Sequence, residues 1–271
     1  MATYSATAIV LRRTKLGETD LILTMLDSSG RIIKAVAKGA RKPKSKLAGA
    51  SALFAGNDLL LHQGNSLDIV SESRPAFRAT HIPSEYRATV GASVVAEFVL
   101  KTHWVGEVEP RLYDMTLACL SALDGIAAVS SVSEAARDAA IDSVVLAFLI
   151  KGLAMLGYRP TVDGCVECGM PLALCSPDQT SGTEACWSPE DAGVRCATCA
   201  PGAPSSAMVP IAAVEWLGVL LNSTFAAVVA HPPHAQALDD LFVMVADLLR
   251  AHGDTSLNAF DTLVSERVSP A

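Results

Sequence analysis

Hydrophobic and polar positions change their spacing about a third of the way along the chain. In the first eighty residues, short runs of branched and aliphatic side chains are separated by turn residues, as in strands joined by tight connections. The turns include Gly30 in the stretch DSSGR and the pair Gly64–Asn65. The runs predict five strands, at residues 8–12, 20–26, 31–37, 58–63 and 67–71.

Five short strands within about eighty residues have the strand count and size of an oligonucleotide/oligosaccharide-binding (OB) barrel. Beyond Pro83 the apolar residues recur at helical spacing instead. This pattern predicts helices at about 84–103, 110–124, 134–157, 210–230, 233–252 and 257–265.

Residues 160–207 are rich in Cys, Gly, Pro and Ser and show no periodicity, so we interpret them as an insert between helices. The predicted fold is α+β and multidomain, with a five-stranded OB-fold barrel, an α-helical domain and an inserted four-cysteine zinc module. The expected domains are 1–80 (barrel), 81–160 (helical, first part), 161–207 (zinc insert) and 208–271 (helical, C-terminal part).

Charge is distributed unevenly between these parts. Residues 1–80 carry twelve Lys/Arg and six Asp/Glu, whereas the whole chain has a net charge of −7. Between Ser28 and Asn57 there are seven basic residues and no acidic one. Such asymmetry indicates a polyanion site on the barrel, although a solvated loop is the alternative. The candidate contacts are Arg12, Arg13, Lys15, Arg31, Lys34, Lys38, Arg41, Lys42, Lys44 and Lys46.

Four of the seven cysteines form two Cys-x-x-Cys pairs, separated by 27 residues. Two residues between thiolates allow both to bind one ion, and two such pairs complete a tetrahedral site. The predicted ligands of a structural Zn²⁺ are Cys165, Cys168, Cys196 and Cys199. Cys175 and Cys186 lie in the same insert, and we expect them to be free or buried thiols.

Several catalytic patterns are missing from the sequence. It contains no phosphate-binding Gly-rich motif and no Gly-x-Ser-x-Gly, and none of its six histidines is followed by Glu two residues later. We therefore expect a protein that is not an enzyme. A zinc hydrolase is one alternative hypothesis. Metal analysis that finds four thiolate ligands and no bound water would exclude it.

The bulk composition bears on location. Half of the residues are apolar (51%), but the longest apolar run, residues 144–150, is followed by Lys151 and is far shorter than the roughly 20 residues of a membrane span. The N-terminal stretch MATYSATAIVLRR has no basic segment ahead of a long apolar one. We expect no signal peptide, no membrane association and a cytoplasmic location.

Two groups of motifs, in this order, resemble the bacterial RecO family of recombination mediators. The first is RRTKLGETDLILTMLDSSGRIIKAVAKGARKPKS, residues 12–45, with Gly-Glu-x-Asp at 17–20 and Lys-Gly-Ala-Arg at 38–41. The second is the cysteine insert, where WSPEDAGVRC has Ala192 at a position that is often glycine in the family. The resemblance implies an OB barrel, a helical domain and a zinc insert.

The resemblance also implies binding of single- and double-stranded DNA and annealing of complementary strands. It further implies that the protein works with RecR to load RecA onto DNA covered by single-strand-binding protein. Many members of the family also bind the acidic C-terminal tail of single-strand-binding protein. The candidate basic residues for such a tail are Arg87, Lys101, Arg111 and Arg137. Only three aromatic residues occur in positions 1–80, Tyr4, Phe54 and Phe77, so the barrel is expected to hold DNA backbones and leave bases free. The second hypothesis is a zinc-containing OB-fold RNA-binding or transcription-associated scaffold.

Overall fold

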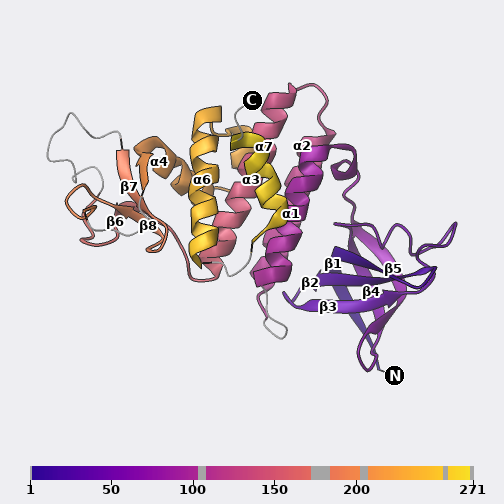
Figure 1. The fold of residues 1–271 in the computed structure, drawn as a ribbon. Helices are drawn as coiled ribbons and strands as arrows, with labels where there is room; N and C mark the ends of the chain where they lie inside the picture. The colour runs from indigo at the N-terminus through magenta and orange to yellow at the C-terminus, as the bar shows by residue number, and fades with distance from the viewer. Residues whose placement is uncertain (1, 103–107, 172–183, 202–206, 253–255, 269–271) are drawn as a thin grey trace. The chain divides into compact units, whose positions relative to one another are not determined.

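Two compact units, Met1–Ala128 and Val129–Ala271, make up the chain in the computed structural model (Figure 1). The first unit holds the five strands and the first two helices, and the second holds the remaining helices and a small sheet. The structure describes residues 2–102, 108–171, 184–201, 207–252 and 256–268.

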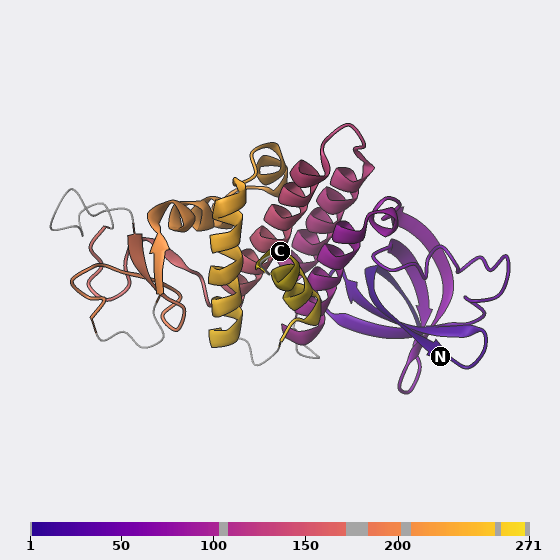
Figure 2. The ribbon, with the colours of Figure 1, turned by 45° about the horizontal axis from the view of Figure 1, so that its top comes forward.

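The five N-terminal strands pair in the order β1-β2-β3-β5-β4, and β4 pairs again with β1, so the sheet forms a barrel (Figure 2). Closure between β3 and β5 is short, since only two pairs of residues are in parallel register there. The predicted five-stranded barrel is thus confirmed. Its strands are β1 Thr3–Leu16, β2 Asp20–Asp27, β3 Ile32–Ala37, β4 Gly56–His62 and β5 Asp68–Phe77.

Alternation along these strands fills the barrel. Leu23 and Met25 of β2 point inward beside Val10 of β1 and Leu61 of β4, and all four are almost completely buried. β1 is much longer than predicted, because its polar first half pairs with β4 while its second half pairs with β2. That polar half lacks the apolar alternation from which a strand is predicted.

Helices α1 (Tyr86–Thr102) and α2 (Pro110–Ala128) belong to the first unit. Pro110 occupies the first position of α2, where its missing N–H has no intrahelical partner to lose. Pro83 lies in a separate 3₁₀ turn, η1 (Ile82–Ser84), which precedes α1. Asp124 of α2 accepts hydrogen bonds from the backbone N–H groups of residues 81 and 82 and so fastens this turn to α2.

The second unit is built around α3, whose residues 141–150 are all buried. α3 contacts α4, α5 and α6, and α7 contacts α6. The predicted helix at 210–230 is wrong in one respect, because the segment forms two helices. The first ends at Asn222, and the Thr224 side chain caps the second by accepting a hydrogen bond from the N–H of Ala227. The bounds are α3 Glu134–Met155, α4 Ile211–Asn222, α5 Phe225–Ala230, α6 Ala235–His252 and α7 Asn258–Val268.

The cysteine insert, whose sequence shows no periodicity, contains a four-stranded sheet of order β6-β8-β7-β9. Its strands are β6 Thr161–Cys165, β7 Glu184–Ser188, β8 Gly193–Arg195 and β9 Ala207–Pro210. They are three to five residues long, too short for period-two alternation to be recognised. Trp187 of β7 is fully buried and provides the largest side chain of this small core.

None of the helices described here has the length and hydropathy that crossing a membrane would require.

Candidate nucleic-acid interface and metal centre

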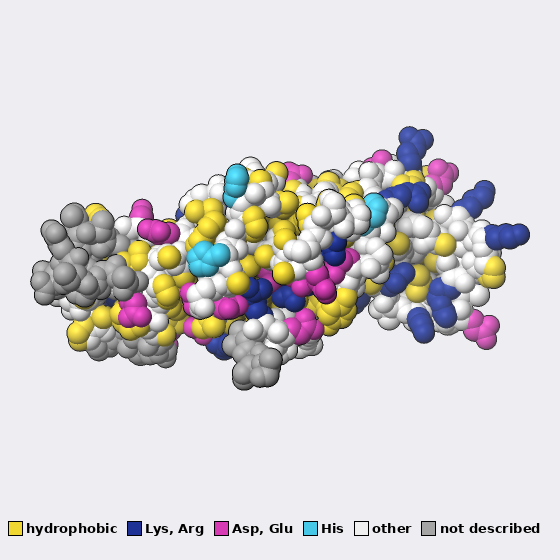
Figure 3. Space-filling view, turned by 90° about the horizontal axis from the view of Figure 1, so that it is seen from above, with side chains coloured by type: hydrophobic (Ala, Val, Ile, Leu, Met, Phe, Trp, Pro, Cys, Tyr) yellow, Lys and Arg dark blue, Asp and Glu magenta, His cyan; other side chains and the backbone are white. Residues whose placement is uncertain are grey.

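All ten candidate DNA-binding residues of the barrel, predicted from the charge pattern, are solvent-exposed. Figure 3 shows Lys and Arg side chains standing out from the surface of the strand-rich end on the face in view. The nine-residue stretch from Lys38 to Lys46, here called the basic loop, follows β3 and begins the connection to β4. Within the part of the chain that the structure describes, the side chains of its four lysines make no hydrogen bond or ion pair.

The basic loop is fastened to the β1–β2 turn, residues 17–19. The backbone N–H of Arg41 donates to Thr19 O at 2.9 Å, and the Arg41 guanidinium donates to Glu18 O at 2.8 Å. Gly39 and Lys44 have positive φ angles of 66° and 61°, so the loop turns sharply twice. These contacts give the loop a defined conformation although its side chains are hydrophilic.

One surface hollow of about 650 Å³ lies between the basic loop and the start of β2. Three ammonium-bearing side chains line it, those of Lys38, Lys42 and Lys44, together with the hydroxyl-bearing residues Thr19 and Ser45. Lysine ammonium groups are compact charges with rotatable donors, which suits phosphate oxygens better than base edges. The hollow therefore has the chemistry of an anion site.

The basic residues on the strands divide between two faces. Arg12 of β1 and Lys34 of β3 are both in register with Thr24 of β2, so they lie on the outer face of three adjacent strands. Arg13 and Lys15 are one step out of this row and lie on the opposite side of β1.

Three of the ten candidates also have contacts within the chain. Arg13 donates to Ser51 O at 3.3 Å, and Arg31 lies 3.5 Å from a carboxylate oxygen of Asp27. With Arg41, these are the arginines whose guanidinium groups support local structure. The side chains of the other seven make no hydrogen bond or ion pair with any described residue, and these are Arg12, Lys15, Lys34, Lys38, Lys42, Lys44 and Lys46.

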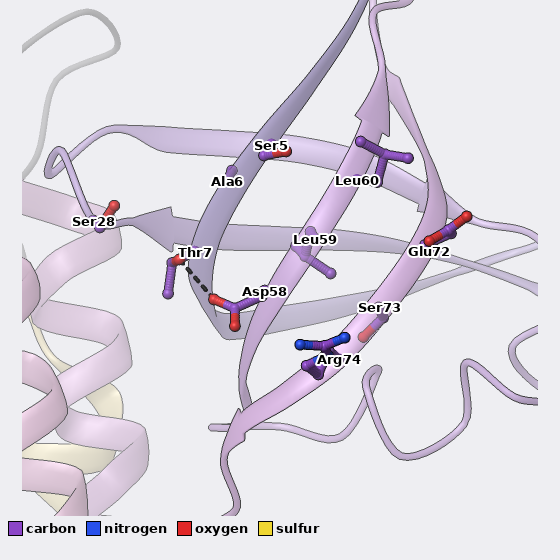
Figure 4. Close-up of a pocket in the computed structure, with 10 residues that line it drawn as sticks. All are labelled: Ser5, Ala6, Thr7, Ser28, Asp58, Leu59, Leu60, Glu72, Ser73 and Arg74. Carbon is purple, nitrogen blue, oxygen red and sulfur yellow. Dashed lines mark hydrogen bonds between the residues drawn. The ribbon is translucent and has the colours of Figure 1, made fainter.

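A second hollow, about 670 Å³, lies on the outer face of β1, β4 and β5 (Figure 4). Asp58 accepts a hydrogen bond from the Thr7 hydroxyl at 2.8 Å, and Glu72 and Arg74 come from β5 beside it. Two carboxylates against one guanidinium give this hollow the opposite character from the lysine-lined one. It repels phosphate, and it provides a site for control substitutions on the same barrel.

The four predicted zinc ligands come together in the insert. The Sγ atoms of Cys165, Cys168, Cys196 and Cys199 all lie within 4.8 Å of one another. Cys165 ends β6 and Cys196 follows β8, so the parallel pairing of these strands brings the two Cys-x-x-Cys pairs side by side. Gly169 has a φ of 71° and donates its N–H to Cys165 O at 2.8 Å, which closes the first turn.

This arrangement fits a tetrahedral metal ion. With Zn–S bonds of about 2.3 Å, the sulfur atoms of a tetrahedral site are roughly 3.8 Å apart. The Sγ atoms of Cys168 and Cys196 are 3.9 Å apart. All four positions are thiols, so a bound ion would have no open position for water, and the site is of the structural type.

Backbone N–H groups stabilise the thiolate form of two of these four thiols, Cys196 and Cys165. Burial opposes the thiolate of Cys196, yet the N–H groups of Cys199 and Thr198 lower its pKa to about 6. The pKa of Cys165 is likewise lowered, against burial, by the N–H groups of Cys168, Cys196 and Glu167. Since the thiolate is the metal-binding form, these hydrogen bonds favour metal at neutral pH.

The remaining candidates stay outside these sites. Cys186 is buried on β7 and does not belong to the four-cysteine cluster, and Cys175 lies outside the described residues. Arg111 forms an ion pair with Glu109, and Arg137 donates to Val129 O.

Asp20 is a site residue that the charge pattern did not reveal. Its Oδ1 accepts the backbone N–H of Gly39 at 2.7 Å, a contact between residues 19 positions apart. The only sequence signal was an acidic residue near a basic segment, and this signal does not indicate which backbone N–H the carboxylate of Asp20 binds.

Two family models match this chain, together covering almost all of the helical and strand elements. Residues 1–77 match the model described as "Recombination protein O N terminal", and residues 83–258 match "Recombination protein O C terminal".

Curated relatives agree with the family models. "DNA repair protein RecO" of Desulfitobacterium hafniense is 31% identical over 199 residues, 73% of this chain and 65% of that protein. Proteins of the same name from Acaryochloris marina and Gloeobacter violaceus are 33% and 34% identical, over 63% of this chain and 55% and 62% of their own lengths. The chain thus spans less than two thirds of the length of the curated relatives it matches.

Proposed function

The chain belongs to the RecO family, and from this premise we propose that it is a DNA-repair protein that mediates recombination by binding DNA without catalysing a reaction. The observation that carries the proposal is family membership over both parts of the chain. The exposed basic residues of the barrel support it, because Lys and Arg at a polyanion surface supply affinity through counterion release. We propose residues 1–80 as the nucleic-acid module.

The ten basic residues of the barrel are proposed to contact phosphates of single- and double-stranded DNA. The stronger candidates are those whose ammonium and guanidinium groups have no partner among the residues that the structure describes. Six of the ten side chains are lysines, which supports reading of the backbone and not of base sequence. A protein with this role binds DNA of any sequence and loses affinity steeply with salt.

Annealing is proposed as the activity that follows from such binding. Two strands held by their phosphates can present unstacked bases to each other. With RecR, the protein is proposed to help load RecA onto DNA covered by single-strand-binding protein, whose C-terminal tail it binds. We propose a cytoplasmic location for this work, as RecR, RecA and DNA require.

The cysteine insert, residues 161–207, is proposed to bind one structural Zn²⁺ through Cys165, Cys168, Cys196 and Cys199. The ion would supply cross-linking of the two Cys-x-x-Cys turns, and the residues around it would hold the short strands in register. Because binding energy and folding energy are the same in such sites, the insert depends on the metal for its fold.

The test is fluorescence anisotropy of labelled single-stranded DNA across a salt series. The native protein is compared with a variant that has Ala at Lys38, Arg41, Lys42, Lys44 and Lys46. Each phosphate contact contributes about 0.7 to the log–log salt slope of single strands, so the slope should fall by up to about 3.5 units. A control variant removes exposed guanidinium groups from elsewhere, with Ala at Arg111, Arg159 and Arg250.

Equal losses in both variants would mean that net charge, and not the basic loop, governs binding. If the native protein binds without salt dependence, phosphate binding by the barrel is wrong. Annealing of two complementary oligonucleotides by the same three proteins then separates DNA binding from strand pairing.

A further inference from the structure

An acidic side chain lies inside the most basic part of the barrel. Asp20 lines the lysine-bearing hollow together with Lys38, Lys42 and Lys44. Its Oδ1 accepts the backbone N–H of Gly39 at 2.7 Å and the hydroxyl of Thr19 at 2.9 Å. The carboxylate is therefore bonded to the basic loop itself, at the residue that follows Lys38.

Charge alone does not explain an aspartate at this place. A carboxylate among lysines weakens the attraction for phosphate, which is the term that dominates nucleic-acid affinity. The hydrogen bonds from Gly39 and Thr19, followed by the nearby Lys38 and Lys42, lower the pKa of Asp20, so it stays ionised at neutral pH. A residue that opposes the attraction but is bonded to the loop has another role.

The geometry suggests that this role is to shape the loop. Gly39 has a φ of 66°, a conformation that exposes its N–H to a partner outside the loop, and Asp20 is that partner. Two residues further on, Arg41 donates to the carbonyls of Glu18 and Thr19 through its guanidinium and its N–H. Residues 39 and 41 are thus both fastened to residues 18–20, and Lys38 precedes these two points while Lys42 and Lys44 follow them.

We propose that Asp20 is a positioning residue that holds Lys38, Lys42 and Lys44 around one hollow, where their ammonium groups converge on a single phosphate of a DNA backbone. This inference rests on the proposed DNA-binding function and deepens it. The hydroxyl of Ser45, which lines the same hollow, can donate to the same phosphate, whereas the single O–H of Thr19 is donated to Asp20. Arg41 has a related supporting role, because its guanidinium is directed at backbone carbonyls.

Two substitutions of Asp20 separate charge from positioning. Asp20→Asn removes the negative charge, while the amide oxygen still accepts from Gly39 and Thr19. Asp20→Ala removes both the charge and the hydrogen bonds. Glu18→Gln is the matched control, since Glu18 is exposed and its carboxylate makes no hydrogen bond or ion pair with the described residues. All three variants have the same net charge.

Binding of a labelled single strand is measured across a salt series for each full-length variant. Glu18→Gln and Asp20→Asn should bind roughly two- to fivefold more tightly than the native protein, the scale of one exposed charge. Asp20→Ala should bind at least about fivefold more weakly than Asp20→Asn, because the hydrogen bonds that order the loop are lost. Its salt slope should fall by about 1 to 2 units as the lysines separate.

Equal affinities and slopes for Asp20→Ala and Asp20→Asn would overturn the inference, because the carboxylate would then act by charge alone. The proposed function fails separately, when the native protein shows no salt-dependent binding. If Asp20→Ala does not fold, as judged by circular dichroism, Thr19→Val and Thr19→Ser are compared instead. Only Ser retains the hydroxyl donor to Asp20, so equal binding by this pair would also overturn the inference.

Discussion

Arg267 of α7 connects three helices of the second unit through its guanidinium group. Its Nη1 lies 2.7 Å from Oδ2 of Asp142 on α3, and its Nε lies 2.7 Å from Oδ1 of Asp239 on α6. The side chain of Asp142 is fully buried, at 0% exposure. The Arg267 Cζ also lies 5.7 Å from the ring centroid of Phe242. Replacing Arg267 by Ala should therefore destabilise this unit strongly.

The magnitude follows from the burial of the partner. Removing one member of a buried ion pair leaves a desolvated charge behind and costs about 3–5 kcal/mol. The cation–π contact with Phe242 adds about 0.5–1 kcal/mol. Arg250, on α6, provides the control, because it pairs with Asp247 but is 71% exposed. Pairs of that kind contribute about 0–1 kcal/mol.

Hydrogen exchange read by mass spectrometry suits this test, since a chain of two units does not give one unfolding transition. Amides of α3 and α6 should exchange at least about a hundredfold faster in Arg267→Ala, which corresponds to about 3 kcal/mol. In Arg250→Ala the change should stay below about fivefold. Similar protection in the two variants would refute the reasoning. A double variant, Asp142→Leu with Arg267→Met, should recover much of the loss.

Three further predictions concern the insert, a turn and a buried amine. Metal analysis should find one Zn²⁺ per chain, and chelation should raise hydrogen exchange in β6 and β8 while leaving the barrel unchanged. Gly30→Ala should lower the free energy of unfolding in urea by well over 1 kcal/mol, because the φ of Gly30 is 84° and a Cβ would lie 2.2 Å from Glu109 O. Gly17→Ala is the control, and it should cost about 1 kcal/mol because Gly17 has a φ of 59° but open space around it. Burial, and to a smaller extent the nearby Arg159, lowers the pKa of Lys151 to about 8 from the usual 10.5. Thermal unfolding should therefore show the native protein gaining stability relative to Lys151→Met as the pH rises from about 8 to 10.5.

Local pattern was sufficient for the elements that bury one continuous apolar face. The β2 strand alternates cleanly along Leu21, Leu23 and Met25, and α3 has a long apolar stretch, so both were predicted from sequence with small errors at their ends. Ala192 is an instructive case. It has a φ of 49°, a left-handed conformation, which explains why glycine suits this position before the second pair of cysteines.

Contacts between distant residues could not be predicted in the same way. The spacing of the cysteines implied a common site because two short turns and one ion determine its geometry. In contrast, the bonds from Asp20 to Gly39 and from Arg41 to Glu18 depend on how β1, β2 and β3 are joined in register. A count of basic residues treats Arg41 as equal to its lysine neighbours, although its guanidinium binds backbone carbonyls.

The few aromatic side chains of the barrel allow a prediction about how DNA is held. Phe54 is buried, Phe77 is half-buried, and Tyr4 is half-buried with its hydroxyl donated to Asp68, so none of these three rings among residues 2–80 is fully exposed for stacking. Stacking on an aromatic side chain is worth about 1–3 kcal/mol per base. A protein that binds only phosphates gains none of this energy.

An oligonucleotide of abasic deoxyribose phosphates should therefore bind within about threefold of an oligothymidine of equal length, because both present the same phosphates. Thymines in the bound oligothymidine should keep the permanganate reactivity of the free strand, since no ring covers them. The five-alanine variant of the basic loop is the control, and it should lose affinity for both oligomers equally. A loss of more than tenfold on removing the bases, together with protected thymines, would refute this reasoning. The bases would then be stacked against the protein, and strands held in that way could not pair while bound.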